Sequence, residues 1–319
     1  MKRRWRGGGG SAGVLSFQAR RGRPVRVPRR AMTPSETLHY EDLGPRDAPV
    51  VVFLHGITGS RRYWRRGVGR LSRSFRLILP DLLGFGLSPK PHLEYTMEVY
   101  RRSVRSLVEG LGLDRRPLMF VAHSLGCLVA LEYAALHPHV GRMALLSLPR
   151  YTDPGSAHRL FWRGSPHYRR LLNEHSLAET VAQMKRTGLE LTLRYMFRFP
   201  WTVLIDSHKF TFKSLTSTLE HCLLNYRVDE ILPAVPPVPT LLVHGAQDSV
   251  APLEHVTPLA ARYPFMRLRP VAGTGHHVFL THTRLCLDLI QSFLEDGVQD
   301  DSRAGAGLHA AGTQIAGTD

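Results

Sequence analysis

Cysteine is scarce in this chain of 319 residues, and long apolar runs do not occur in it. The three cysteines, Cys127, Cys222 and Cys286, lie far apart and form neither a paired framework nor a metal-binding spacing. This pattern favours a reducing compartment, so we expect a cytoplasmic protein in which Cys127 is a small core residue rather than a reactive thiol. No apolar run approaches the roughly 18–20 residues that cross a bilayer, so we expect no transmembrane segment.

Acidic residues are missing from residues 1–31, which hold ten of the 42 Lys and Arg residues and so account for +10 of the net charge of +16. Glycines, prolines and few apolar residues predict a disordered basic leader over 1–33, without the apolar region of a secretory signal. Three interpretations stay open. The segment is an extension ahead of a true start at Met32, a transit peptide that would direct the protein to an organellar matrix, or a weak attractor of nucleic acid or acidic lipid. We expect no specific nucleic-acid partner.

Metal and phosphate signatures are also missing. No His, Cys and Asp cluster has metal-ligand spacing, and Gly84 and Gly86 lack the rest of a dinucleotide fingerprint. We therefore expect neither a metal nor a cofactor.

Apolar segments of strand length alternate with helical patterns from about residue 34 onward. This alternation predicts an α/β fold with a mostly parallel, doubly wound sheet that is covered on both faces. The expected strands are 38–43, 50–54, 75–79, 118–122, 143–148, 240–243 and 266–271. The expected helices are 60–71, 96–111, 125–136, 253–262 and 282–295.

The alternation stops over residues 149–228, which have a helical pattern and many aromatic residues. We interpret this segment as a helical cap inserted between core strands. The core then consists of 34–148 and 229–296, and the Gly- and Ala-rich residues 297–319 form a disordered tail.

A short pattern at Ala122-His123-Ser124-Leu125-Gly126 joins an expected strand to an expected helix. Strand, sharp turn and helix with a serine at the apex are typical of a nucleophile elbow, although Ala122 stands where glycine is usual. The strand and helix pass close together there, so a side chain larger than methyl at 122 or 126 should clash.

Two further polar residues follow later strands. Asp248 and His276 come after the strands at 240–243 and 266–271, and the order Ser, Asp, His is the one that this fold uses. A serine needs a base within hydrogen-bond reach, and that base needs an acid to orient it. His277 as the base and Asp153 as the acid stay open as alternatives.

Several motifs together resemble the α/β-hydrolase superfamily over residues 38–296, and within it a capped, esterase- or lipase-like member with a serine nucleophile. They are His55-Gly56 with Gly59, Asp81 with Gly84, Gly86 and Ser88, the elbow, His244-Gly245 with Asp248 and Pro252, and Gly273 with Gly275-His276. The resemblance implies that Ser124 is the nucleophile, His276 the base and Asp248 the residue that orients it. It also implies an oxyanion hole made by the backbone N–H groups of Ile57 and Leu125. His55, His123 and His244 are expected to be hydrogen-bonded scaffold residues.

The serine narrows the chemistry that the resemblance implies. Relatives that open epoxides or displace halide use an aspartate at the elbow, so Ser124 argues against both reactions. We expect a serine hydrolase that cleaves a carboxylic ester or related acyl bond through an acyl-enzyme on Ser124. C–C bond hydrolysis, a lyase reaction, cofactor-free perhydrolysis and a non-catalytic binding module stay open. Aromatic residues over 195–201 favour a small-molecule substrate with an apolar acyl or aromatic part, unless they only pack the cap onto the core.

Overall fold

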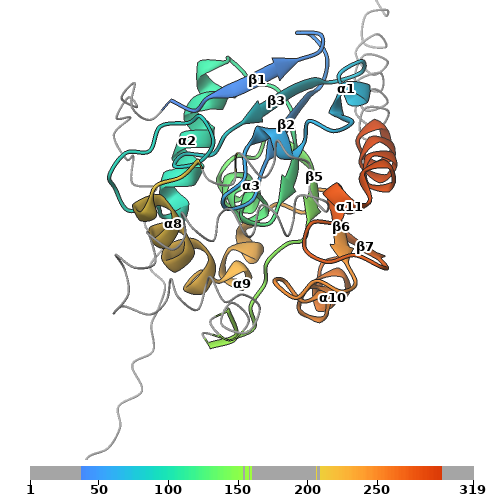
Figure 1. The fold of residues 1–319 in the computed structure, drawn as a ribbon. Helices are drawn as coiled ribbons and strands as arrows, with labels where there is room; N and C mark the ends of the chain where they lie inside the picture. Colours follow the sequence, from blue (N-terminus) through green and yellow to red (C-terminus); the bar gives the residue numbers. More distant parts are fainter. Residues whose placement is uncertain (1–36, 154, 158, 160–205, 207–208, 297–319) are drawn as a thin grey trace, which may run out of the picture. The chain divides into compact units, whose positions relative to one another are not determined.

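A seven-stranded sheet forms the centre of the described residues in the computed structural model, which are 37–153, 155–157, 159, 206 and 209–296. Its strand order is β1-β3-β2-β4-β5-β6-β7 (Figure 1). The edge strand β1 runs antiparallel to β3, and every other neighbouring pair is parallel. The strands are β1 (Tyr40–Leu43), β2 (Val50–Leu54), β3 (Arg76–Pro80), β4 (Leu118–His123), β5 (Val140–Leu146), β6 (Thr240–Gly245) and β7 (Met266–Val271). The predicted mostly parallel α/β sheet is confirmed.

Both faces of the sheet are buried at strands β2, β3, β4 and β6. Successive residues of β2 enter different apolar clusters: Val50, Val52 and Leu54 join one, whereas Val51 and Phe53 join the other. The first cluster includes α2 (Met97–Gly110), α3 (Leu125–Leu136) and α10 (Leu253–Arg262). The second includes α1 (Val68–Leu71), α11 (Val278–Thr281) and the helix over 283–296. Because side chains alternate across a strand, burial of both faces requires the continuous apolar runs seen in the sequence.

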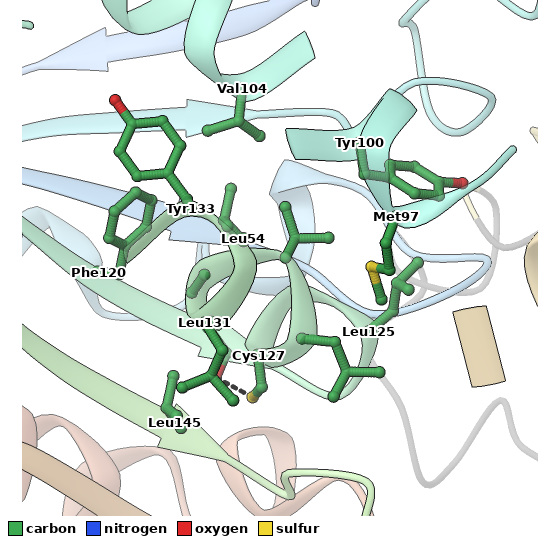
Figure 2. Close-up of a cluster of buried hydrophobic side chains, with 14 of the residues drawn as sticks. Leu54, Met97, Tyr100, Val104, Phe120, Leu125, Cys127, Leu131, Tyr133 and Leu145 are labelled. Carbon is green, nitrogen blue, oxygen red and sulfur yellow. Dashed lines mark hydrogen bonds between the residues drawn. The ribbon is translucent and has the colours of Figure 1, made fainter. Parts of the chain in front are cut away.

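Helix α3 is surrounded by other elements on nearly every side. Figure 2 shows its residues Leu125, Cys127 and Leu131 among side chains from α2 and the sheet. The Cys127 Sγ–H group lies 3.3 Å from the carbonyl oxygens of both Ala122 and Leu146. Burial raises the pKa of this thiol, so Cys127 is a core residue, as are the other two buried cysteines.

The prediction of a single helix over 60–71 is wrong. The chain forms a short 3₁₀ helix, η2 (Arg61–Tyr63), and then the separate helix α1. Gly67 stands at the start of α1 with φ of 91°, a left-handed conformation that interrupts the helix and that glycine adopts without steric cost. Ser60 does cap the first of these helices, since its hydroxyl accepts a hydrogen bond from Arg62 N–H.

The described chain between β5 and β6 is mostly helical, in agreement with a helical insertion at this point. It contains α8 (Phe212–Thr218), the π-helical turn η4 (Leu219–Leu224), α9 (Val228–Ile231) and the 3₁₀ helix η5 (Leu232–Ala234). Most of the aromatic cap segment, the leader and the tail lie outside the described residues, so the boundaries 149–228, 1–33 and 297–319 stay predictions. No helix in the described part is long and apolar enough to cross a membrane.

Candidate active site

The turn between β4 and α3 holds Ser124 in a strained backbone conformation. Its φ is 52° and its ψ is −119°, in a region that residues other than glycine rarely occupy. Ser124 N–H donates to the carbonyl of Leu146 on β5, 3.0 Å away, which attaches the turn to the neighbouring strand. A Cβ on Gly126 would lie only 2.5 Å from the carbonyl oxygen of Leu54, so even a methyl group clashes there. The size limit at 126 is therefore tighter than the sequence predicted.

Ser124, His276 and Asp248 lie in one hydrogen-bonded line. The Nε2 atom of His276 is 2.9 Å from Ser124 Oγ, and its Nδ1 atom is 2.9 Å from Asp248 Oδ2. A carboxylate only accepts, so Nδ1 carries the ring proton and Nε2 is left to accept from the serine hydroxyl. The three side chains come from residues that are 124 and 28 positions apart in the chain.

The carboxylate of Asp248 is fixed on its other side by the backbone. The N–H groups of Val250 and Ala251 each donate to Oδ1 at 2.9 Å. Burial opposes ionisation of this carboxyl, but the electrostatic interaction with His276 and the hydrogen bonds from His276 and Ala251 outweigh burial and lower the pKa of Asp248. Asp248 is therefore ionised at neutral pH, and it orients the imidazole ring.

The turns that carry Asp248 and His276 pack closely on each other. A Cβ on Gly245 would lie 2.3 Å from the carbonyl oxygen of Gly275, and Gln247 N–H donates to the carbonyl of Thr274 at 2.9 Å. Glycine at 245 thus lets the turn after β7 approach the turn after β6. This close approach brings His276 within hydrogen-bond reach of Asp248.

The loop after β2 approaches Ser124 from another side. A Cβ on Gly56 would lie 3.1 Å from the Cβ of Ser124, so this backbone touches the elbow. His55 holds the loop, because its Nε2 atom accepts from Leu82 N–H at 2.8 Å and its Nδ1–H donates to the Gly56 carbonyl at 2.7 Å. Ile57 follows directly on this loop, and Leu125 begins α3, where the first N–H groups have no partner within the helix.

The two alternatives from the sequence occupy other positions. The His277 ring lies 5.5 Å from the His276 ring, and burial, with a smaller effect of His276, lowers the pKa of His277 to about 3. The Asp153 carboxylate is bonded to Arg159 at 2.9 Å. His276 and Asp248 are the pair that lies in line with Ser124.

Comparison with known proteins agrees with this architecture. A model described as the alpha/beta hydrolase fold matches residues 49–283, which is more than half of the chain. The chain belongs to the alpha/beta hydrolase fold family.

Other members of the alpha/beta hydrolase family give no single activity. An uncharacterised protein of Mycobacterium tuberculosis is 26% identical over 269 residues, covering 77% of this chain and 75% of its own. Epoxide hydrolase 1 of Caenorhabditis elegans is 22% identical over 282 residues, covering 81% of this chain and 67% of its own. Among solved structures, E-2-(acetamidomethylene)succinate hydrolase has a TM-score of 0.65 and 21% identity, covering 81% of this chain and 95% of its own. The structural likeness shows the fold alone.

Other polar residues named by the motifs support the backbone around this site. Asp81 accepts from the backbone N–H of Arg61, from its guanidinium and from Leu87 N–H, at 2.6, 2.8 and 2.8 Å. His244 Nε2 donates to the Ala251 carbonyl at 2.6 Å, on the loop that carries Asp248. The described residues hold no group of three or more His, Cys, Asp or Glu side chains that could bind a metal.

Two features near the site were missed at the level of sequence. The Nε2 atom of His123 lies 2.9 Å from the carbonyl oxygen of His276. Ser60 Oγ, just beyond the loop that carries Ile57, donates to Asp206 at 2.7 Å. Both bonds join residues more than 140 positions apart, so no local pattern could have indicated the pairing.

Proposed function

We propose that this protein is a serine hydrolase that cleaves a carboxylic ester or related acyl bond through an acyl-enzyme on Ser124. One observation carries the proposal: Ser124 Oγ, the His276 ring and the Asp248 carboxylate lie in line, with 2.9 Å at each junction. This is the geometry in which an imidazole can take the serine proton while a carboxylate stabilises the resulting imidazolium.

In the first step, Ser124 Oγ attacks the carbonyl carbon of the substrate while His276 Nε2 takes the hydroxyl proton. The carbonyl oxygen becomes an oxyanion, and we assign its stabilisation to the backbone N–H groups of Ile57 and Leu125. A donor of this kind contributes about 3–4 kcal/mol to the transition state. The helix macrodipole adds to this effect, since Leu125 is the first residue of α3.

In the second step, the tetrahedral intermediate expels the alcohol, which receives the proton from His276. The acyl group is then an ester of Ser124. A water molecule that is deprotonated by His276 attacks this ester, and collapse of the second intermediate returns the proton to Ser124 and releases the acid.

The nucleophile separates this proposal from the activity named for the similar epoxide hydrolase. Relatives that open epoxides use an aspartate at the elbow, which forms an alkyl ester, whereas the hydroxyl of Ser124 suits attack on a carbonyl. We propose a small-molecule substrate with an apolar acyl or aromatic part. The basis is the apolar, aromatic character of residues 195–201, which belong to the segment inserted between the core strands.

A fluorophosphonate probe tests the proposal. The wild-type protein should form one covalent adduct on Ser124, and Ser124→Ala should form none. A panel of short and long acyl p-nitrophenyl esters would then define the preferred acyl chain. The matched histidine pair is His276→Ala, which should label at least 100-fold more slowly, and His277→Ala, which should label at close to the wild-type rate. Absence of labelling on wild-type Ser124 would overturn the proposal and favour a binding module.

A further inference from the structure

The residue before the nucleophile connects three parts of the site. His123 is the last residue of β4, is buried, and pairs with Leu146 in the β4–β5 ladder, so its backbone is fixed by the sheet. Its Nε2 atom lies 2.9 Å from the carbonyl oxygen of His276. Because a carbonyl only accepts, Nε2 carries the proton in this bond. The bond therefore joins the backbone of the base to the residue adjacent to Ser124.

The rest of the His123 ring is enclosed by neighbours that set its orientation. The ring stacks on Tyr63 with 4.5 Å between centroids and 19° between planes. Its Nδ1 edge faces the loop after β2, since a Cβ on Gly56 would lie 2.8 Å from Nδ1. Burial, with smaller effects of His276 and His277, lowers the pKa of His123 well below its usual value, so the ring is neutral.

A purely packing role would not favour histidine at this position. Nδ1 of His123 is buried and has no hydrogen-bond partner within the described residues. A buried polar atom without a partner is destabilising by roughly 1–3 kcal/mol. A leucine of similar size would avoid that cost while filling the space. What leucine cannot supply is the N–H group that holds the His276 carbonyl.

We propose that His123 is a positioning residue that fixes the backbone of His276 and thereby holds Nε2 of the base against Ser124 Oγ. This inference rests on the proposed serine-hydrolase function. Asp248 restrains the ring of His276 at Nδ1, whereas His123 restrains its main chain. The Gln247–Thr274 bond holds the same turn two residues earlier, and the bond from His123 adds a restraint at His276 itself. A shift of about 1 Å in a reacting group can slow catalysis about 100-fold.

Substitution of His123 by glutamine and by leucine separates positioning from packing. The amide nitrogen of glutamine stands the same number of bonds from Cβ as Nε2 of histidine, so His123→Gln keeps a donor for the carbonyl. We expect its rate of fluorophosphonate labelling, and its kcat on p-nitrophenyl acetate, to stay within about threefold of wild type. His123→Leu should lower both about 10- to 100-fold, with KM changed less than about twofold, because only the base is displaced.

His139 offers a matched control. It is partly buried, contacts Tyr133 Oη at 3.2 Å, and lies before β5 at the end of the strand away from Ser124. His139→Gln and His139→Leu should both leave the labelling rate unchanged. If His123→Leu does not fold, as judged by its unfolding transition, His123→Asn replaces it, since the shorter amide is polar but cannot reach the carbonyl.

The outcomes are distinct. Slow labelling of the leucine or asparagine protein with recovery in the glutamine protein supports the inference. Wild-type rates in the leucine protein, or equal losses in the leucine and glutamine proteins, would overturn it while leaving the proposed function standing. Failure of the wild-type protein to label on Ser124 would overturn the proposed function and this inference with it.

Discussion

Gly126 illustrates how one backbone contact decides the identity of a residue. Alanine usually stabilises a helix relative to glycine by about 1 kcal/mol, so propensity alone would favour it in α3. A Cβ at 126 would, however, meet the Leu54 carbonyl at 2.5 Å, and a backbone carbonyl within a sheet cannot turn aside. The steric clash with the Leu54 carbonyl should therefore outweigh the higher helix propensity of alanine.

We predict that Gly126→Ala lowers the free energy of unfolding by about 1–3 kcal/mol, because it overpacks the contact between α3 and β2. Gly110, at the end of α2, is the matched control, since a Cβ there meets nothing within 4 Å. Gly110→Ala should be neutral or stabilising by up to about 1 kcal/mol. Urea unfolding of the three proteins measures this difference, and equal effects at 126 and 110 would contradict the steric account.

Substitution of Asp248 should impair catalysis without preventing folding. Asp248→Asn keeps the shape of the side chain but permits the wrong imidazole tautomer, so we predict a fall in kcat of about 10³- to 10⁴-fold on a p-nitrophenyl ester. Asp153→Asn is the control and should stay within about twofold of wild type, since Asp153 is bonded to Arg159 at the surface. A larger loss at 153 than at 248 would transfer the orienting role to Asp153.

The grouping of Ser124, Asp248 and His276 could be predicted from sequence because each follows a strand, and the carboxyl ends of parallel strands meet at one edge of a sheet. The bond from His123 to the His276 carbonyl could not be named in this way. It depends on where the turn after β7 settles relative to β4, and residue type at 123 carries no information about a backbone acceptor 153 positions away.

At the scale of elements, strands β2, β3, β4 and β6 were predicted well because burial on both faces gives continuous apolar runs. Strand β5 begins at Val140 rather than at the predicted 143, because its first residues include the less buried Gly141 and Arg142. The helix predicted over 60–71 was wrong because its apolar residues keep a helical spacing although the backbone breaks at Gly67. Hydrophobic spacing indicates which residues face the core, and Val68 and Leu71 still face the core after the left-handed turn at Gly67. A glycine inside a helical pattern is the one local indication that could have warned of the break.

A second element-scale feature is the link between the insertion and the loop after β2. Asp206, which lies between β5 and β6 in the chain, is buried and accepts from Ser60 Oγ at 2.7 Å and from Lys209 Nζ at 2.7 Å. Arg62 Nε lies 3.5 Å from the same carboxylate. Burial opposes ionisation, but the bonds from Lys209 and Ser60 and the charge of Arg62 outweigh it and lower the pKa of Asp206.

We predict that this link is energetically coupled. In a double-mutant cycle, Ser60→Ala and Asp206→Ala should show an interaction free energy of about 0.5–3 kcal/mol, because the two side chains share one buried hydrogen bond. Ser72→Ala with Asp206→Ala is the control pair, since Ser72 Oγ donates to the nearby Gly69 carbonyl at 2.9 Å. That pair should be additive within about 0.5 kcal/mol. Additivity in the Ser60 pair, measured by urea unfolding, would show that the link contributes nothing.

At the scale of the whole molecule, charge is distributed unevenly along the chain. Residues 1–31 carry +10 of the net +16, and the remaining 288 residues carry the other +6. Exposed basic clusters attract polyanions without sequence preference, and the attraction weakens as salt rises. Residues 1–31 should therefore determine how strongly the protein is retained on a polyanion column, whereas the core should determine catalysis.

We predict that the full chain is retained on heparin at low salt and elutes as salt rises, and that removal of residues 1–31 shifts elution to clearly lower salt. The rate of fluorophosphonate labelling at Ser124 should be the same in both proteins, which also serves as the control for folding. Unchanged elution after the deletion would place the basic surface elsewhere in the chain.

If the proposed function is correct, the acyl group of the substrate is carried for a time on Ser124 Oγ, and this acyl-enzyme can be trapped. Wild-type protein is mixed with a p-nitrophenyl ester, quenched in acid within the first turnovers and weighed by mass spectrometry. We expect a mass increase equal to one acyl group on the peptide that contains Ser124, and in Ser124→Ala neither an adduct nor hydrolysis above the uncatalysed rate. Hydrolysis of the ester by Ser124→Ala at the wild-type rate would contradict the proposed function.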